Sequence, residues 1–325
     1  MACRAAHRVI TPTSPGARFR ALLGGDEIVI APGAYDALTA RLVERAGFGA
    51  VYLSGAGVSY THLACPDVGL VTLDEMVARA SAITAAVQIP VLADGDTGYG
   101  NAINVQRTVR SFERCGLAGI QLEDQSFPKR CGHLAGKEVI AAEEMAGKIR
   151  AAADARRDPS FVIVARTDAF ATHGLEDALR RLRLYADAGA DVLFADGPTT
   201  TSDLAAIPPA LPLPVMVNMV EGGRTPALPA AELQRLGYRL VIFPNSLVRF
   251  FARQGAELLV RLRSEGTTEA ARGEMLSFDE LNALLGTAEV LERGRRYSEG
   301  EVSDTRTRGS KSAAKAPRGA RSTRS

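Results

Sequence analysis

The chain has 325 residues, of which 46% are apolar and 23% charged, the usual balance of a globular protein with a full core. No apolar run is long enough to cross a bilayer, and the N-terminus lacks the apolar stretch of a secretory signal, so we expect neither a membrane protein nor a secreted one. Only 6% of the residues are aromatic and Trp is absent, which argues against a binder of single-stranded nucleic acid.

The formal net charge of +2 is unevenly distributed along the chain. Residues 305–325 hold seven Lys or Arg and no acid, whereas the rest of the chain holds 32 basic and 37 acidic side chains. We expect residues 301–325 to be a disordered basic tail, a solubilising extension rather than an attachment to nucleic acid. Residues 1–20 are also expected to be poorly ordered.

Four scattered cysteines fit neither a disulfide framework nor a zinc site. This usage predicts a reduced, cytoplasmic protein.

Between the two ends, short apolar runs bounded by Gly, Pro or Asp predict buried strands. In chain order these runs are Ile28–Ala31, Ala50–Leu53, Val91–Ala93, Gly119–Leu122, Phe161–Ala165, Val192–Phe194, Val215–Val217 and Leu240–Phe243. Amphipathic helices are predicted at Ala37–Ala46, Leu73–Ala86 (after a capping box, Thr72 to Glu75), Asn104–Cys115, Ala142–Ala153, Leu175–Ala188, Pro229–Leu236 and Ser246–Glu265. Eight strands alternating with helices predict an α/β fold, a (β/α)8 TIM-type barrel over residues 21–300, rather than an open sheet.

Polar residues follow nearly every predicted strand. They are Ser54, Asp94 with Asp96, Glu123 with Asp124, Arg166 with Asp168, Asp196, Asn218 with Glu221 and, beyond the last strand, Arg249. Because the active sites of such barrels lie at the carboxyl ends of the strands, this pattern predicts a catalytic site there.

The acids after the third and fourth strands predict a metal site. Asp94 and Asp96 are two residues apart and would face the same way in an extended chain, and Glu123 and Asp124 bring further carboxylates. Like charges so close together repel each other unless a cation lies between them. Oxygen ligands with few histidines favour Mg²⁺, with Mn²⁺ possible.

Two further features predict anion binding at the same rim. A charged Arg166 inside an apolar run requires an anion, which is either a substrate carboxylate or, alternatively, a structural partner such as Asp168. The backbone N–H groups of Ser54, Gly55 and Ala56 offer a second place for a carboxylate. The predicted ligand is therefore a small dicarboxylate or oxo acid.

The segment from Lys129 to His133 holds a candidate acid–base group. Two cations, Lys129 and Arg130, precede Cys131, and an imidazole follows it. Such neighbours lower the pKa of a thiol, so Cys131 is expected to exchange a proton near neutral pH.

Six segments resemble the isocitrate lyase/phosphoenolpyruvate mutase superfamily, in family order across residues 20–290. They are YLSGAG (52–57), DGDTGYGN (94–101), LEDQ (122–125), PKRCGH (128–133), VARTDA (164–169) and NMVEGGRTP (218–226). The resemblance implies a (β/α)8 barrel whose last helix is exchanged between the subunits of a homodimer, usually within a homotetramer. It also implies Mg²⁺ dependence and chemistry next to a carboxylate in 2-hydroxy or 2-oxo acids.

The resemblance also implies roles for individual residues. Asp94 and Asp96 match the metal-binding aspartates, with Glu123 as the outer carboxylate. Cys131 matches the cysteine of the lyase branch, and Tyr52 matches a tyrosine that handles the proton of the substrate hydroxyl. Arg166 is expected to be catalytic as the carboxylate-binding arginine. The expected substrate-binding residues are Ser54, Gly55, Ala56, Gly132, His133, Asp196 (Glu in many lyases), Asn218 and Arg249.

Two features narrow the branch. Glu221-Gly222-Gly223 resembles the 2-alkylmalate lyases, oxaloacetate-cleaving enzymes and carboxyphosphonoenolpyruvate mutase-like members more than the methylisocitrate lyases, which tend to have Glu-Phe-Gly. Phe278 stands where methylisocitrate lyases place an arginine.

We therefore expect a Mg²⁺-dependent carbon–carbon lyase. Its substrate is a small 2-hydroxy dicarboxylate of the 2-alkylmalate or methylisocitrate type (a tricarboxylate in the latter case), and its products are a 2-oxo acid such as pyruvate and a carboxylic acid. The alternatives are an oxaloacetate decarboxylase or hydrolase and a carboxyphosphonoenolpyruvate phosphonomutase. A non-catalytic binding protein is the least favoured hypothesis, and neither a membrane nor nucleic acid is an expected partner.

Overall fold

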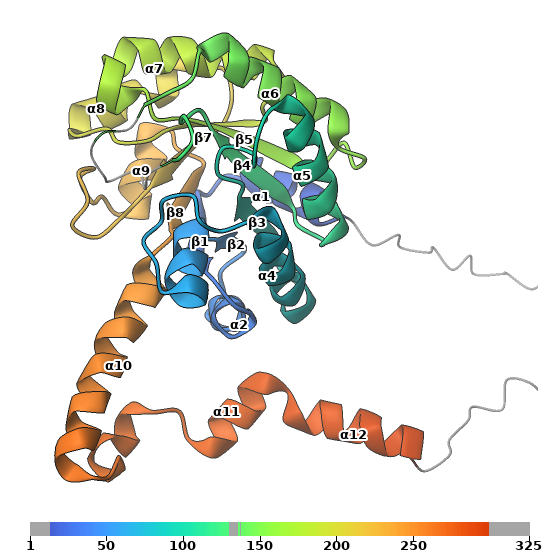
Figure 1. Cartoon of the computed structure of the whole chain (residues 1–325), viewed down its shortest axis with the longest axis vertical. Coiled ribbons are helices and arrows are strands. Elements are labelled where there is room, and N and C mark those ends of the chain that lie inside the picture. The colour runs from blue at the N-terminus through green and yellow to red at the C-terminus, as the bar shows by residue number, and fades with distance from the viewer. Residues whose placement is uncertain (1–13, 130–135, 137, 299–325) are drawn as a thin grey trace, which may run out of the picture. The chain divides into compact units, whose positions relative to one another are not determined.

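The computed structural model describes residues 14–129, 136 and 138–298. Its strands are β1 (Val29–Ala34), β2 (Val51–Leu53), β3 (Val91–Asp94), β4 (Gly119–Glu123), β5 (Val162–Thr167), β6 (Val192–Ala195), β7 (Val215–Asn218) and β8 (Leu240–Phe243). They pair in parallel, each with the next, and β8 pairs with β1 to close the barrel (Figure 1). The predicted (β/α)8 barrel is confirmed.

Helices connect successive strands and cover the barrel, as helices must in a parallel sheet. They are α1 (Pro15–Leu23), α2 (Ala37–Arg45), α3 (Gly55–Val58), η1 (Ser59–Leu63), α4 (Leu73–Ala86), α5 (Ala102–Arg114), α6 (Ala142–Ala155), α7 (Phe170–Asp187), α8 (Thr201–Ala206), η2 (Pro208–Ala210), α9 (Ala230–Leu236) and α10 (Ser246–Glu265). The capping box predicted from Thr72 to Glu75 is present at the start of α4. In α7 the backbone breaks at Gly174 (φ 84°), directly before the predicted helix start at Leu175.

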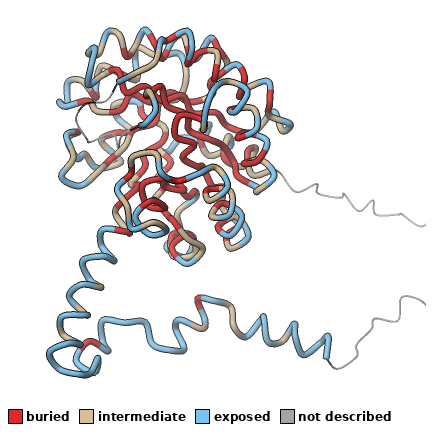
Figure 2. Tube along the Cα trace, viewed as in Figure 1, coloured by how far each residue is buried: buried red, intermediate tan, exposed pale blue. Residues whose placement is uncertain are grey.

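Side chains alternate between the two faces of the strands, and this alternation produces two apolar clusters. In β2, Val51 and Leu53 belong to the outer cluster, which includes residues of the surrounding helices. Tyr52 belongs to the inner cluster, together with Leu92 and Val164. Figure 2 shows the resulting buried interior of the barrel.

Helix α1 contributes to the inner cluster through Phe19 and Leu23. The Ser14 side chain caps the helix, Pro15 occupies its first turn, and Arg20 Nε donates to the Ser160 carbonyl just before β5 at 2.9 Å. The helix therefore lies at the amino ends of the strands. The expected poor order of residues 1–20 is wrong for Pro15–Arg20, because Phe19 is completely buried. Residues 1–13 and the predicted tail, 301–325, lie outside the described part of the chain.

Contacts divide the chain into a unit that ends at Val260 and a second unit that begins at Arg261. The expected barrel domain, 21–300, therefore spans more than one compact unit. The second unit holds η3 (Glu269–Glu274), α11 (Phe278–Leu285) and α12 (Thr287–Ser298), and Arg261 forms an ion pair with Glu274. Among its described residues only Ala271 and Leu284 are buried.

No helix in the described part of the chain has the length and apolar character needed to cross a membrane. The cytoplasmic location stays a prediction.

Candidate active site

The two aspartates after β3 lie in a tight turn. Asp94 is the last residue of the strand, and Asp96 has a left-handed backbone conformation with φ 46°. The Asp96 N–H donates to Asp94 Oδ1 at 3.1 Å. The two carboxylates are therefore neighbours, as predicted, but the extended backbone assumed in that prediction is wrong.

Arg166 on β5 contacts three carboxylates. Its Nε and Nη2 each donate to Asp168 at 2.8 Å, and Nη2 also lies 3.2 Å from Asp196 Oδ2. Glu123, which pairs with Arg166 across β4 and β5, lies 3.3 Å from its Nη1. The structural pairing with Asp168 that we considered as an alternative is thus present. Burial would lower the pKa of Arg166, but these three acids raise it, so the guanidinium stays charged.

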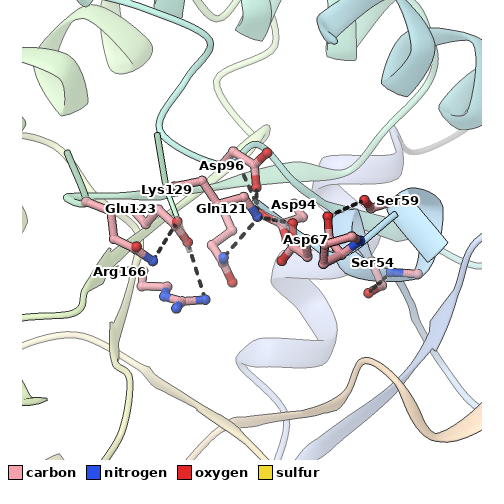
Figure 3. Close-up of polar contacts among 12 residues, drawn as sticks. Ser54, Ser59, Asp67, Asp94, Asp96, Gln121, Glu123, Lys129 and Arg166 are labelled. Carbon is pink, nitrogen blue, oxygen red and sulfur yellow. Dashed lines mark hydrogen bonds and ion pairs between the residues drawn. The ribbon is translucent and has the colours of Figure 1, made fainter. Parts of the chain in front are cut away.

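Lys129 brings a second cation into the site (Figure 3). Its ammonium lies 2.5 Å from Asp67 and 2.7 Å from Asp96, and its side chain is only 4% exposed. Burial opposes the charge, but Asp96 and Asp67 raise the pKa of Lys129 well above its usual value. Two carboxylates thus hold this ammonium, whereas its expected effect on the thiol of Cys131 stays a prediction. Cys131, Gly132 and His133 lie outside the described residues.

The predicted metal-binding acids are all buried. Burial raises the pKa of Asp94 and Asp96, in Asp94 with added repulsion from Asp96, and it raises the pKa of Glu123 well above its usual value. Among the described residues, the carboxylates outnumber the two cations that face them, Lys129 and Arg166. A bound divalent cation would neutralise this excess of negative charge.

The donor set suits Mg²⁺. Within residues 14–129, 136 and 138–298, no three His, Cys, Asp or Glu side chains converge closely enough to hold one ion directly. Mg²⁺ does not need such a cage, because it usually takes one or two protein carboxylates and keeps several waters. The residues present therefore fit this ion.

Tyr52 and Gln121 line the interior beside Asp94. The Tyr52 hydroxyl donates to Gln121 Oε1 at 3.1 Å, and Gln121 Nε2 lies 3.4 Å from Asp94 Oδ1. Burial and the charge of Asp94 raise the pKa of Tyr52 well above its usual value. Tyr52 is thus a hydrogen-bond donor in this structure, which does not favour the role of a base.

Asp124 does not join this group, contrary to the prediction that it adds to the crowded carboxylates. Successive side chains on a strand point to opposite faces, so Asp124 turns away from the side on which Glu123 lies. It accepts hydrogen bonds from Tyr185 and Arg181 of α7 instead.

The other predicted substrate contacts divide into two groups. Ser54, Ala56 and Asn218 line one cavity together with Tyr52, Asp94, Glu123, Lys129 and Arg166. Asp196 lies beside the same Arg166. Arg249 is not among the described residues that line this cavity. It is exposed on α10, where its Nη1 donates to the Glu221 carbonyl at 2.7 Å.

Gly55 lies directly against the carboxylate of Asp94, a predicted metal ligand. A Cβ atom at this position would lie 2.9 Å from Asp94 Oδ2, so the backbone approaches the carboxylate more closely than a side chain allows.

The cavity lining also includes apolar residues, namely Ala56, Val220, Ile242 and Pro244. Asn218 Oδ1 is buried and has no hydrogen-bond partner within the described part of the chain. Such an atom is available to a ligand hydroxyl.

Four residues of the site were not identified from the sequence: Asp67, Gln121, Lys129 as an ion-pair partner, and Asn245, which accepts from Ser54 Oγ at 3.4 Å. Gln121 precedes Glu123 by two positions on β4, so the period of a strand could have identified it. Asp67 and Lys129 lie in loops, where no period applies.

Comparison with known proteins agrees with this geometry. A phosphoenolpyruvate phosphomutase family description matches residues 19–263. A 2,3-dimethylmalate lyase from Eubacterium barkeri is 47% identical over 87% of this chain and 98% of its own. A solved oxaloacetate acetylhydrolase in complex with 3,3-difluorooxalacetate has a TM-score of 0.84 at 37% identity, covering 88% of this chain and 97% of the other. A phosphonopyruvate hydrolase solved with oxalate and Mg²⁺ has a TM-score of 0.79 at 30% identity, covering 88% and 100%.

A polar, carboxylate-rich cavity at the carboxyl ends of the strands defines a (β/α)8 enzyme that acts on small anions. The chain belongs to the phosphoenolpyruvate phosphomutase family, and the superfamily resemblance of its six motifs is confirmed.

The ion pairs of Lys129 predict a pH-dependent loss of stability in Lys129→Met. The variant leaves Asp67 and Asp96 buried without their cation, and we expect its free energy of unfolding at pH 8 to be about 3 kcal/mol below that of the wild type. Burial raises the folded-state pKa of Asp96, and Lys129 lowers it, so the variant raises this pKa further and its destabilisation is greatest above it. The difference should therefore narrow when urea unfolding is repeated at pH 5.

The double variant Asp67→Asn with Lys129→Met provides the control, because it also removes one of the stranded charges. It should recover part of the loss at pH 8. An equal difference at both pH values would contradict the ion-pair explanation.

Proposed function

We propose that the chain is a Mg²⁺-dependent carbon–carbon lyase that cleaves a small 2-hydroxy dicarboxylate into a 2-oxo acid and a carboxylic acid. The observation that carries the proposal is the 47% identity over 98% of a 2,3-dimethylmalate lyase. The cavity supports it, since its lining combines cations and carboxylates with apolar side chains.

Asp94 and Asp96 would hold the metal ion, with Glu123 as the outer carboxylate of the site. The charge excess of these buried acids supports this assignment, as does the Mg²⁺ named in the phosphonopyruvate hydrolase structure. When bound, Mg²⁺ supplies positive charge that stabilises the oxygen of a 2-oxo acid product, and Mn²⁺ suits the same oxygen ligands.

The protein's own groups bind and orient the substrate. Arg166 would bind one carboxylate through Nη1, because its contact with Glu123 is longer, at 3.3 Å, than the 2.8 Å hydrogen bonds by which Asp168 holds Nε and Nη2. The start of α3, with Ser54, Gly55 and Ala56, would receive the other. Asn218, whose Oδ1 has no partner within the described part of the chain, would be a further substrate contact.

Cleavage requires one proton to leave and one to arrive. The proton of the C2 hydroxyl would pass to Glu123, the outer carboxylate of the proposed metal site, which lies 3.3 Å from the Arg166 guanidinium. As the C2–C3 bond breaks, its electron pair stays on C3, and C3 takes a proton from the Cys131 thiol. Tyr52 would remain neutral and donate a hydrogen bond.

The apolar residues of the lining favour substrates with small alkyl groups. Ala56, Val220 and Ile242 offer no partner to a third carboxylate but would contact methyl groups. A second candidate reaction is oxaloacetate cleavage, which the 0.84 TM-score with oxaloacetate acetylhydrolase favours.

An assay of oxo-acid release tests the proposal. With MgCl₂ present, we expect release of a 2-oxo acid from 2,3-dimethylmalate. The kcat/KM for this substrate should exceed the kcat/KM for 2-methylisocitrate and that for oxaloacetate. Removal of divalent ions with EDTA should abolish turnover, and added Mg²⁺ or Mn²⁺ should restore it. Turnover of oxaloacetate alone would replace the lyase with the second candidate, and turnover unaffected by EDTA would overturn the metal assignment.

Cys131→Ser tests the proton donor. A hydroxyl gives up its proton far less readily than a thiol, so kcat should fall by at least about 100-fold. Mg²⁺ affinity, measured by calorimetry, should not change. Cys65→Ser is the matched control, because Cys65 is a half-buried free cysteine outside the cavity lining, and its kcat should stay within twofold of the wild type. Wild-type turnover in Cys131→Ser would remove the thiol from the mechanism.

We also propose a homodimer, or a homotetramer built from such dimers, in which the C-terminal helices are exchanged between subunits. Large apolar side chains in the second unit support this, since Phe278 is 82% exposed and Leu291 is 68% exposed. Light scattering should give the mass of two or four chains for the wild type. Phe278→Asp should give a lower mass, whereas a monomeric wild type would contradict the proposal.

A further inference from the structure

A buried polar network lies behind the candidate site, on the face of β4 and β5 that meets α7. We call Asp124, Thr167, Asp168, Arg181 and Tyr185 the Asp124 network. Asp124 is completely buried. It accepts from Thr167 Oγ1 at 2.6 Å, Tyr185 Oη at 2.8 Å, the Asp168 N–H at 2.9 Å and Arg181 Nη1 at 3.2 Å.

Arg181 connects this network to two other elements. Its Nη1 also donates to the Ile140 carbonyl at 2.8 Å, and its Nε donates to Asp177 Oδ2 at 2.8 Å. The Ile140 N–H in turn donates to the Asp124 backbone carbonyl at 2.9 Å. Arg181, a residue only 7% exposed, therefore connects α7 to the end of β4 and to the residues that lead into α6.

The network reaches the site through Asp168. Its backbone N–H is held by Asp124, and its carboxylate holds Arg166 through two hydrogen bonds of 2.8 Å. A shift of Asp124 would therefore move the Asp168 carboxylate, whose two hydrogen bonds set the direction of the Arg166 guanidinium. Arg181 and Tyr185 themselves lie outside the cavity lining.

We propose that Arg181 and Tyr185 are positioning residues, which fix Asp124 and, through Asp168, the direction in which Arg166 presents its guanidinium to a bound carboxylate. The inference rests on the proposed function in one respect, namely that Arg166 binds the substrate carboxylate. Both residues act through other side chains, and neither touches the substrate.

Binding of oxalate in the presence of MgCl₂, measured by calorimetry, tests the role. Tyr185→Phe removes one donor to Asp124 and keeps the ring, and Arg181→Lys keeps the charge but cannot make all the contacts of the guanidinium. We expect the Kd for oxalate to rise about tenfold in Arg181→Lys and several-fold in Tyr185→Phe, the lower end of what outer-shell partners contribute at ligand sites. Arg180→Lys is the matched control, because Arg180 is exposed and bonds the same Asp177, and its Kd should stay within twofold of the wild type.

A double-mutant cycle separates positioning from a general structural role. In an Arg166→Lys background, Arg181→Lys should cost little further oxalate affinity, since the guanidinium it positions is gone. If Arg181→Lys raised the Kd for oxalate by the same factor in the wild-type and Arg166→Lys backgrounds, the inference would be overturned. An unchanged Kd in the single variant Arg181→Lys would also overturn it.

The cycle also distinguishes this inference from the proposed function. Coupling between Arg181 and Arg166 in a chain that cleaves no 2-hydroxy dicarboxylate would overturn the lyase assignment and support the positioning role. Additive effects in an active lyase would overturn the positioning role alone. A wild-type chain that neither binds oxalate nor turns over substrate would overturn both.

Discussion

The balance of buried charge at the carboxyl ends of the strands constrains the whole site. In the described part of the chain six carboxylates gather there, those of Asp67, Asp94, Asp96, Glu123, Asp168 and Asp196, and two cations face them, Lys129 and Arg166. A buried charge without a partner costs several kcal/mol, so the position of each ammonium and guanidinium group decides which acids stay ionised. Lys129 forms ion pairs with the loop carboxylates of Asp67 and Asp96. Arg166 forms ion pairs with the carboxylates at the ends of β4, β5 and β6. The remaining negative charge is what makes the cavity suited to a divalent ion.

The fold could be predicted because its determinants are local. Each strand is a short apolar run, and an amphipathic helix was predicted in every crossover except the one between β6 and β7, where the structure has the short α8, so the order of elements led to eight units and a closed barrel. The prediction failed at Pro15–Arg20, where a short helix with modest periodicity is stabilised by burial of Phe19 rather than by its own pattern. Tertiary packing of this kind leaves little trace in a single sequence.

The sequence allowed us to predict which residues lie together at the carboxyl ends of the strands, but not which side chains pair with each other there. That Asp94, Glu123 and Arg166 come together follows from parallel strands, which deliver their last residues to one rim. The partner of each side chain depends on loop conformation and rotamer, so the ion pair of Lys129 with Asp67, 62 positions earlier, could not be inferred. The opposite directions of Glu123 and Asp124 did follow from strand geometry, but the prediction placed both in one cluster. The loop residues expected to act on the substrate, from Cys131 to His133, stay predictions.

The left-handed backbone at Asp96 limits which amino acids can stand there. Asn, Asp and Gly tolerate this conformation best, and other residues pay for it in strain, about 1 kcal/mol or more. Replacement by Ala or Glu would therefore distort the turn after β3 as well as change the carboxylate. Asn removes the charge and preserves the main-chain conformation. Asp96→Asn is therefore the substitution that isolates the effect of this carboxylate charge.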